Sequence, residues 1–140
     1  MPSTPPGATD MAARTDDLDP PQPGVVRGIF NICSAWGLTD AESLHLLGAT
    51  DLAELEAWRG GDIASTTGET TMRMGHMIGI YGLLVAITGS HEECVRWMGA
   101  PNEGALFDGT TPLEYLLGGG RERMARVRLV LRDVWEGAVP

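Results

Sequence analysis

The stretch from Trp97 to Leu117 carries the strongest conformational constraints in this sequence. Pro101 fixes its own φ and disfavours the α region for the residue before it, so the preceding helix is expected to end near Gly99. Thr111 followed by Pro112 is typical of an N-cap and the first residue of a new helix. The stretch therefore predicts a helix, a shaped loop and a second helix.

The predicted loop contains residues that accept unusual backbone angles. Asn102, Gly104 and Gly109 all tolerate a positive φ, which favours a compact loop over a floppy one. The leucines of the second helix fall on one face: Leu113, Leu116 and Leu117. Taken by itself, this pattern is an ordinary helix-loop-helix.

Several residues follow one another in a recognisable order here and further along the chain: Trp97, Pro101-Asn102, Phe107-x-Gly109-x-x-Pro112-Leu113, Leu116-Leu117-x-Gly119, Val127-Arg128 and Leu131. This order resembles the toxin-binding domain of Xre/MbcA/ParS-type antitoxins. With the upstream helices, the match runs from about Val25 to the C-terminus. The partners of that family are RES-domain toxins, which consume NAD. The resemblance implies an antitoxin that neutralises such a toxin by covering its active site.

Composition divides the chain into three parts. Residues 1–24 hold six of the nine prolines and little that can be buried, which predicts a disordered arm; the alternative is a segment that orders on a partner. The resemblance implies an Xre-like helix-turn-helix unit of three helices in residues 25–62. It also implies a helical toxin-binding domain with a C-terminal tail in residues 63–140. The whole fold is expected to be all-α.

Apolar residues begin to recur at helical spacing from Val25 onwards. The first helix is predicted to end at Gly37 and to bury one stripe: Val26, Ile29, Phe30, Cys33 and Trp36. Thr39 and Glu42 form a capping box for the second helix. A third helix begins after Thr50 or Asp51, ends at Gly60-Gly61 and carries three large apolar residues: Leu52, Leu55 and Trp58.

Three short helices with tight turns are also compatible with a DNA-binding helix-turn-helix. Thr50 and Arg59 are the residues we assign to DNA contacts in that case. The acidic residues of the presumed recognition helix, such as Glu54 and Glu56, would repel backbone phosphates. The net charge of −9 also opposes non-specific attraction to nucleic acid. A helix-turn-helix repressor is therefore the alternative, and binding to operator DNA is expected to be weak.

The second half of the chain contains the longest predicted helix, from Gly68 to Gly89. Its buried face is expected to contain Met74, Met77, Ile78, Tyr81, Leu84, Val85 and Thr88. Ser90 and Glu93 predict a capping box for the helix that carries Trp97. Gly118 to Gly120 predict a mobile hinge, although a phosphate cradle is the alternative. A final helix from Arg121 to Trp135 follows, with an inner stripe of Met124, Val127, Val130 or Leu131, and Val134.

The final helix and the tail supply the surface expected to contact the toxin. All ten basic residues are arginines and five of them lie between Arg121 and Arg132, while Trp and Arg often dominate the energy of protein interfaces. The predicted toxin-binding residues are Arg128, Arg132, Asp133, Trp135, Glu136, Val139 and Pro140. An acidic C-terminal end is expected to occupy a cationic substrate cleft. The resemblance also implies a homodimer, although a monomer's core would use the same apolar residues.

The sequence contains no convincing active site. His45, His76 and His91 lie on separate predicted helices, and no phosphate-binding loop or nucleophile elbow is present. Cys33 and Cys94 are too few for a disulfide framework or a zinc site. We therefore expect no enzyme activity, no metal and no cofactor. Without a leader pattern or an apolar run of about 20 residues, we expect a cytoplasmic protein without a membrane partner.

Overall fold

The computed structural model describes residues 19–137, and this part of the chain contains seven α-helices and no strand. The all-α prediction is confirmed. The helices are α2 (Pro23–Ala35), α3 (Asp40–Leu47), α4 (Leu52–Arg59), α5 (Gly68–Thr88), α6 (His91–Gly99), α7 (Pro112–Leu117) and α8 (Arg121–Trp135). Most of the predicted N-terminal arm lies outside the described residues. Its last two residues belong to α2, because Pro23 occupies the first turn of that helix.

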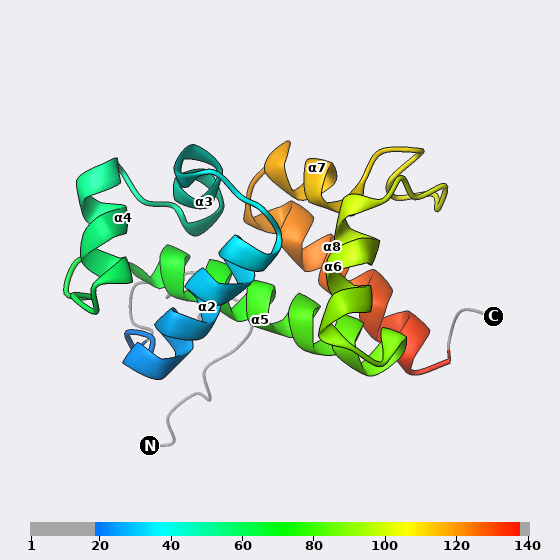
Figure 1. Ribbon diagram of the computed structural model, residues 1–140, viewed down its shortest axis with the longest axis horizontal. Coiled ribbons are helices and arrows are strands. Elements are labelled where there is room, and N and C mark those ends of the chain that lie inside the picture. The colour runs from blue at the N-terminus through cyan, green and yellow to red at the C-terminus, as the bar shows by residue number, and fades with distance from the viewer. Residues whose placement is uncertain (1–18, 138–140) are drawn as a thin grey trace, which may run out of the picture.

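The long helix α5 runs through the middle of the molecule, and its most extensive contact is with α8 (Figure 1). Helices α2, α3 and α4 lie towards the N-terminal end of α5, and α6 lies beside its C-terminal end (Figure 1). The largest fully buried side chains come from both halves of the chain: Ile29, Leu46, Leu47, Leu55, Trp58, Met74, Met77, Ile80, Leu84, Met98, Leu116 and Met124. The first three described helices and the later ones therefore share one hydrophobic core.

The helices begin where the capping residues predict. Thr39 and Glu42 form a complete capping box, and so do Thr111 and Glu114 at the start of α7. Asp51, rather than Thr50, is the N-cap of α4. Ser90 caps α6, but the Glu93 carboxylate accepts a hydrogen bond from Arg96, so the predicted second half of that box is replaced by an ion pair.

The buried faces differ from the predicted ones at several positions. Ile78 is 38% exposed, whereas Ile80 is fully buried. On α8, Leu131 is buried and Val130 is 36% exposed, which decides between these two predicted positions, whereas Val134, predicted on the inner stripe, is 40% exposed. Of the three large apolar residues that α4 carries, Leu55 and Trp58 are buried but Leu52 is 51% exposed. Helical spacing indicates only that an apolar stripe exists, and the neighbouring helices decide which edge of the stripe they cover.

The link between α7 and α8 is a packed turn and not the free hinge that three glycines predict. The Arg123 guanidinium donates a hydrogen bond of 2.9 Å to the carbonyl of Tyr115. A Cβ atom at Gly119 would lie 2.4 Å from Cδ of Arg123. Gly118 and Gly119 therefore leave the space that the Arg123 side chain occupies as it passes directly over the backbone.

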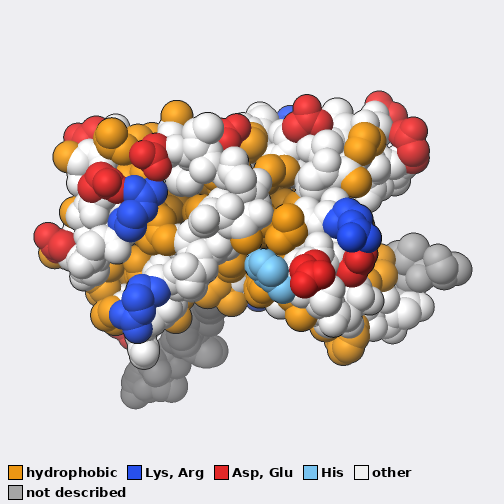
Figure 2. All heavy atoms as spheres, viewed as in Figure 1, with side chains coloured by type: hydrophobic (Ala, Val, Ile, Leu, Met, Phe, Trp, Pro, Cys, Tyr) orange, Lys and Arg blue, Asp and Glu red, His pale blue; other side chains and the backbone are white. Residues whose placement is uncertain are grey.

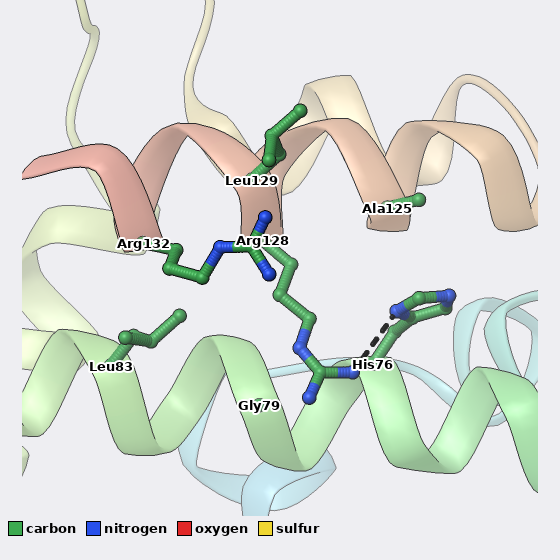
Figure 3. Close-up of a pocket in the computed structure, with 7 residues that line it drawn as sticks. All are labelled: His76, Gly79, Leu83, Ala125, Arg128, Leu129 and Arg132. Carbon is green, nitrogen blue, oxygen red and sulfur yellow. Dashed lines mark hydrogen bonds between the residues drawn. The ribbon is translucent and has the colours of Figure 1, made fainter.

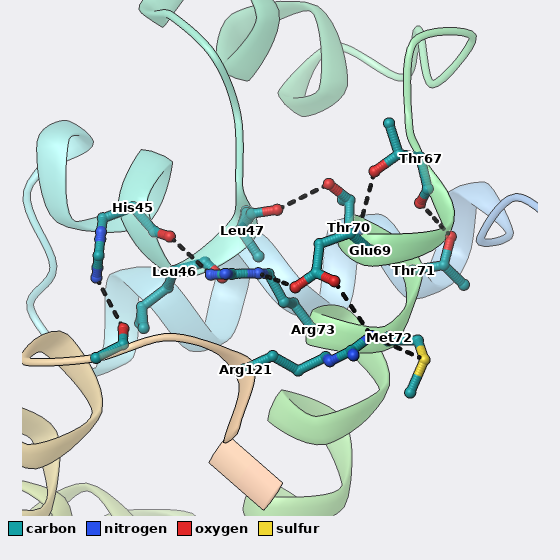
Figure 4. A network of polar contacts seen from close by, with 11 residues as sticks. His45, Leu46, Leu47, Thr67, Glu69, Thr70, Thr71, Met72, Arg73 and Arg121 are labelled. Carbon is teal, nitrogen blue, oxygen red and sulfur yellow. Dashed lines mark hydrogen bonds and ion pairs between the residues drawn. The ribbon is translucent and has the colours of Figure 1, made fainter. Parts of the chain in front are cut away.

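A polar network joins α3 to α5 and to the start of α8 (Figure 4). The Arg73 guanidinium donates to the last carbonyls of α3, those of His45 and Leu46, at 3.1 and 3.2 Å. Its Nε atom pairs with Glu69 at 2.9 Å, and Arg121 pairs with the other oxygen of Glu69 at 3.1 Å. A cation at a helix C-terminus satisfies free carbonyls and the helix dipole together. Arg73 thus fixes the orientation of α3 on α5.

Helices α3 and α4 pack against each other within the first half of the fold. Whether this pair acts as a DNA-binding helix-turn-helix remains a prediction. A membrane-spanning helix is not found between Asp19 and Gly137, since no helix there combines the necessary length with sufficient apolar character.

Candidate partner-binding surface

The loop between α6 and α7 is closed by its own backbone. The Asn102 amide donates to the carbonyl of Thr110 at 3.0 Å, and the Gly109 amide donates to the carbonyl of Asn102 at 2.8 Å. The Asn102 side chain accepts a hydrogen bond from the amide of Gly104 at 2.8 Å. Of the three residues expected to tolerate a positive φ, only Gly109 adopts one (φ 88°). Asp108, which is not one of the three, also has a positive φ (50°). Asn102 stiffens the loop through its side chain instead.

An aromatic ladder fixes this loop to both neighbouring helices. Trp97 contacts Phe107 edge to face with ring centroids 5.6 Å apart, and Phe107 contacts Tyr115 in the same way at 5.5 Å. The Arg123 guanidinium lies over the Tyr115 ring, 4.6 Å from its centroid. Such pairs stabilise beyond the area they bury. Tyr115 and Arg123 were not among the predicted site residues, and the glycines before Arg123 were the only signal for its position.

The residues from Trp97 to Leu113 that carry the resemblance are thus mainly structural. Phe107 and Pro112 are buried, Trp97, Asn102 and Leu113 are half-buried, and Pro101 and Gly109 are exposed where the chain turns. Pro101 ends α6 at Gly99 as predicted, since the residue after the helix, Ala100, is extended. The motif therefore builds a rigid loop that stands beside the C-terminal half of α8.

An apolar groove separates this loop from α8, and we call it the loop groove. It has a volume of about 410 Å³. Its walls come from α5, α6, the loop and α8, and they contain Leu84, Ile87, Thr88, Trp97, Asn102, Gly104, Ala105, Leu106, Phe107, Val130, Leu131 and Val134. Most of these side chains are apolar, so the groove fits apolar side chains of another molecule.

The C-terminal half of α8 is unusually apolar for an exposed helix. Four of the seven large apolar residues exposed within residues 19–137 lie there: Leu129 (49%), Val130 (36%), Val134 (40%) and Trp135 (57%). We call these four residues the α8 tip. Single exposed apolar residues are common on proteins, but Val130 and Val134 line the loop groove, and exposed apolar residues beside an apolar groove are typical of a protein interface.

The predicted toxin-binding residues divide over α8. Arg128 and Arg132 lie on the side that faces α5, where they line a second groove with His76 and Gly79 (Figure 3). Asp133 is half-buried, and Trp135 and Glu136 are exposed at the end of the helix. Val139 and Pro140 lie outside the described residues.

Both predicted DNA-contacting residues are engaged within the chain. Arg59 pairs with Asp40 at 3.0 Å and with Glu56, and its guanidinium lies over the Phe30 ring at 5.0 Å from the centroid. The Thr50 amide donates to the Glu54 carboxylate at 2.9 Å, and this bond is the main reason why the pKa of Glu54 is lowered. An arginine held by two carboxylates is poorly placed to neutralise a phosphate.

The remaining chemically reactive groups are dispersed or buried. Burial raises the pKa of the Cys33 and Cys94 thiols, which keeps both in the unreactive neutral form. Between residues 19 and 137, no three His, Cys, Asp or Glu side chains are grouped in a way that could hold a metal ion. On the face drawn in Figure 2, acidic side chains are spread over both ends of the molecule, and basic side chains occur in small separate groups.

Comparison with known proteins identifies a relative without an assigned function. The chain is 28% identical over 111 residues to the uncharacterized protein y4oB of Sinorhizobium fredii (strain NBRC 101917 / NGR234), an alignment that covers 78% of this chain and 82% of the relative. No protein-family model matches the chain. No solved structure matches it either.

Proposed function

We propose that this chain is an antitoxin that binds a cognate RES-domain, NAD-degrading toxin and covers its active site. The order of the motif residues from Trp97 to Leu131 supports the family, and the α8 tip beside the loop groove supports a binding role. In this proposal the chain acts by shape and catalyses no reaction. It forms a homodimer within the complex, as the resemblance implies.

The observation that carries the proposal is the position of the α8 tip. Trp135 is 57% exposed at the end of the helix, where it is free to insert into a pocket of a partner. Val130 and Val134 line the loop groove, which can accept an apolar side chain of the partner in return. Arg132, Asp133 and Glu136 are neighbours of these residues in the sequence, and charged residues are typical of the rim of an interface. Burying this apolar area against a partner stabilises the complex, because apolar surface is removed from water. In the isolated chain the same area stays exposed to water.

The C-terminal end supplies the proposed plug. Glu136 directly follows α8 and is exposed, and Val139 and Pro140 follow it in the sequence. If the toxin holds the pyrophosphate of NAD with cationic groups, the carboxylate of Glu136 has the charge needed to occupy the same space. This step of the proposal depends on the resemblance.

The binding role is tested by first asking whether a RES-domain protein is encoded beside this gene, and then by mixing that protein with this chain. We expect the two purified proteins to associate, and we expect Trp135→Ala to raise the dissociation constant at least tenfold, which is about 1.4 kcal/mol. Leu52→Ala is the matched control, because Leu52 is 51% exposed on α4, away from the α8 tip. No association with the wild-type chain, or equal effects of the two substitutions, would refute the proposal.

The plug is tested by measuring NAD loss in a mixture of the two proteins. The full chain should prevent the loss, and a chain that ends at Trp135 should bind but protect incompletely. Full inhibition by this truncated chain would exclude the C-terminal end as the plug while leaving the binding role intact.

The alternative, a helix-turn-helix repressor, is distinguished by a gel-shift with the DNA upstream of the gene at a stated salt concentration. Because Arg59 is held by Asp40 and Glu56, we expect the free chain to bind this DNA weakly at most. Tight binding by the free chain that is lost in Arg59→Ala would favour the repressor.

A further inference from the structure

A second groove lies between the sides of α5 and α8 (Figure 3). It has a volume of about 430 Å³ and is lined by His76, Gly79 and Leu83 from α5 and by Ala125, Arg128, Leu129 and Arg132 from α8. Two guanidinium groups and an imidazole therefore share a cavity with three apolar side chains. We call this the arginine groove.

Arg128 reaches across the groove to α5 because position 79 has no side chain. A Cβ atom at Gly79 would lie 2.4 Å from Nε of Arg128, so the guanidinium rests directly on the backbone of α5. One of its terminal nitrogens lies 3.4 Å from Nδ1 of His76 (Figure 3). Burial, Arg128 and Arg121 lower the pKa of His76, against a smaller opposing effect of Glu69. The imidazole is therefore neutral at pH 7 and accepts from Arg128.

The positive charge of the arginine groove is not balanced by the described part of the chain. Between Asp19 and Gly137, ion pairs involve Arg59, Arg73, Arg96 and Arg121, and none involves Arg128 or Arg132. This is notable in a chain whose formal net charge is −9. Two arginines one helical turn apart repel each other unless an anion lies between them.

The lining favours carboxylates over phosphate. Phosphate is commonly held by free backbone amides at helix N-termini, but every residue that lines this groove lies beyond the first four residues of its helix. Only side chains can donate here, and because a guanidinium forms two parallel hydrogen bonds with a carboxylate or with a phosphate, the apolar lining is what favours the carboxylates of a protein segment. The apolar wall made by Leu83, Ala125 and Leu129 fits an apolar side chain next to those carboxylates.

We propose that the arginine groove binds an acidic segment of the partner protein, in which two carboxylates about one helical turn apart flank an apolar side chain. Arg128 and Arg132 each pair with one carboxylate, and the apolar side chain packs on Leu129. This inference builds on the proposed function, since the toxin is the partner that supplies the segment.

The groove is tested first in the isolated chain. The probe is a helical peptide with two glutamates four residues apart and a leucine between them, and the control peptide carries glutamines instead. We expect the glutamate peptide to shift the NMR signals of the Arg128 and Arg132 side chains and to raise the pKa of His76, because a carboxylate nearby favours the imidazolium. Equal binding of both peptides, or saturation of these signals by inorganic phosphate alone, would overturn the proposal.

Gly79→Ala provides a test that changes no charge. The new methyl group should displace the Arg128 guanidinium and weaken peptide binding several-fold. Gly82→Ala is the matched control. Gly82 lies on the same helix, and a Cβ atom there meets nothing within 4 Å. Unchanged peptide binding in Gly79→Ala would contradict the assigned position of Arg128.

Charge reversal then separates this inference from the proposed function. Arg128→Glu should raise the dissociation constant for the RES-domain protein at least tenfold and reduce its salt dependence, whereas Arg126→Glu, exposed and outside the groove, should change it less than twofold. If toxin binding depends on Trp135 but responds equally to both reversals, the arginine groove is not part of the interface. If the glutamate peptide binds but the toxin does not associate, the groove stands and the antitoxin function fails.

Discussion

Arg123 connects two features that lie apart in the sequence, the glycines before α8 and the aromatic ladder of the loop. Its guanidinium donates to the carbonyl of Tyr115 and covers the ring of the same residue. Its aliphatic part leaves no room for a Cβ atom at Gly119. One side chain thus holds α7 against the start of α8.

Gly119→Ala should therefore destabilise the protein by about 1–3 kcal/mol, as overpacking typically does. Gly82→Ala, where a Cβ atom meets nothing within 4 Å, should stabilise it by up to about 1 kcal/mol, because alanine is the better helix former. Urea unfolding of both variants measures the difference. Equal effects would show that Arg123 yields without loss.

The capping box of α7 leads to a prediction about pH. The Thr111 amide donates to the Glu114 carboxylate, and this bond lowers the pKa of Glu114 in the folded state. Because the pKa of Glu114 is lower in the folded state, its ionised carboxylate stabilises the fold at pH values above the pKa of the unfolded state, about 4.3. This stabilisation is lost as the pH falls through the pKa of the folded state. Glu114→Gln should thus lower the melting temperature at pH 7 and leave it unchanged near pH 2. A pH-independent difference would contradict this assignment.

At the scale of elements, the loop between α6 and α7 is stable because its ends and its middle are held independently. Asn102 closes the ends through hydrogen bonds to Gly109 and Thr110. Phe107 fixes the middle, since it is only 5% exposed between Trp97 and Tyr115. The loop can consequently serve as a fixed wall of the loop groove.

Phe107→Ala should cost about 3–5 kcal/mol of stability, because it leaves a cavity and removes both aromatic contacts. Leu52→Ala, on the exposed side of α4, should change stability by less than about 0.5 kcal/mol. Chemical unfolding gives both values. A loss below about 1 kcal/mol in Phe107→Ala would mean that the ladder does not hold the loop.

At the scale of the whole molecule, the side chains that stabilise the fold are separate from those proposed to bind the partner. The core draws on every described helix, whereas the α8 tip is exposed and the arginines of the arginine groove lie at the edge of the contact between α5 and α8. This separation permits binding to be changed without unfolding the chain.

One exposed tryptophan, Trp135, and one buried tryptophan, Trp58, test this separation. Trp135→Ala should change the free energy of unfolding of the free chain by less than about 0.5 kcal/mol. Trp58→Ala should cost about 3–5 kcal/mol, since Trp58 is fully buried and its indole donates to Ser65. Denaturation followed by circular dichroism distinguishes the two. A large loss in Trp135→Ala would place that residue in the core and not in a binding surface.

Helix positions were readable from local chemistry. Thr39, Ser90 and Thr111 cap the helices that follow them, and Pro101 ends the one before it, because each acts through atoms only a few residues away in the chain. The exposed arginines and Trp135 of the candidate site were also predicted, since the end of an amphipathic helix stays outside the core.

Only the tertiary structure decided which edge of each apolar stripe is buried by neighbouring helices and which residues the arginine side chains contact. Ile80 is buried in place of Ile78 because the neighbours of α5 cover that edge of the helix. Arg73 binds the end of α3, and Arg128 rests on Gly79, through contacts between residues distant in sequence. Burial and groove formation depend on which helices become neighbours, and periodicity within one helix contains no information about its neighbours.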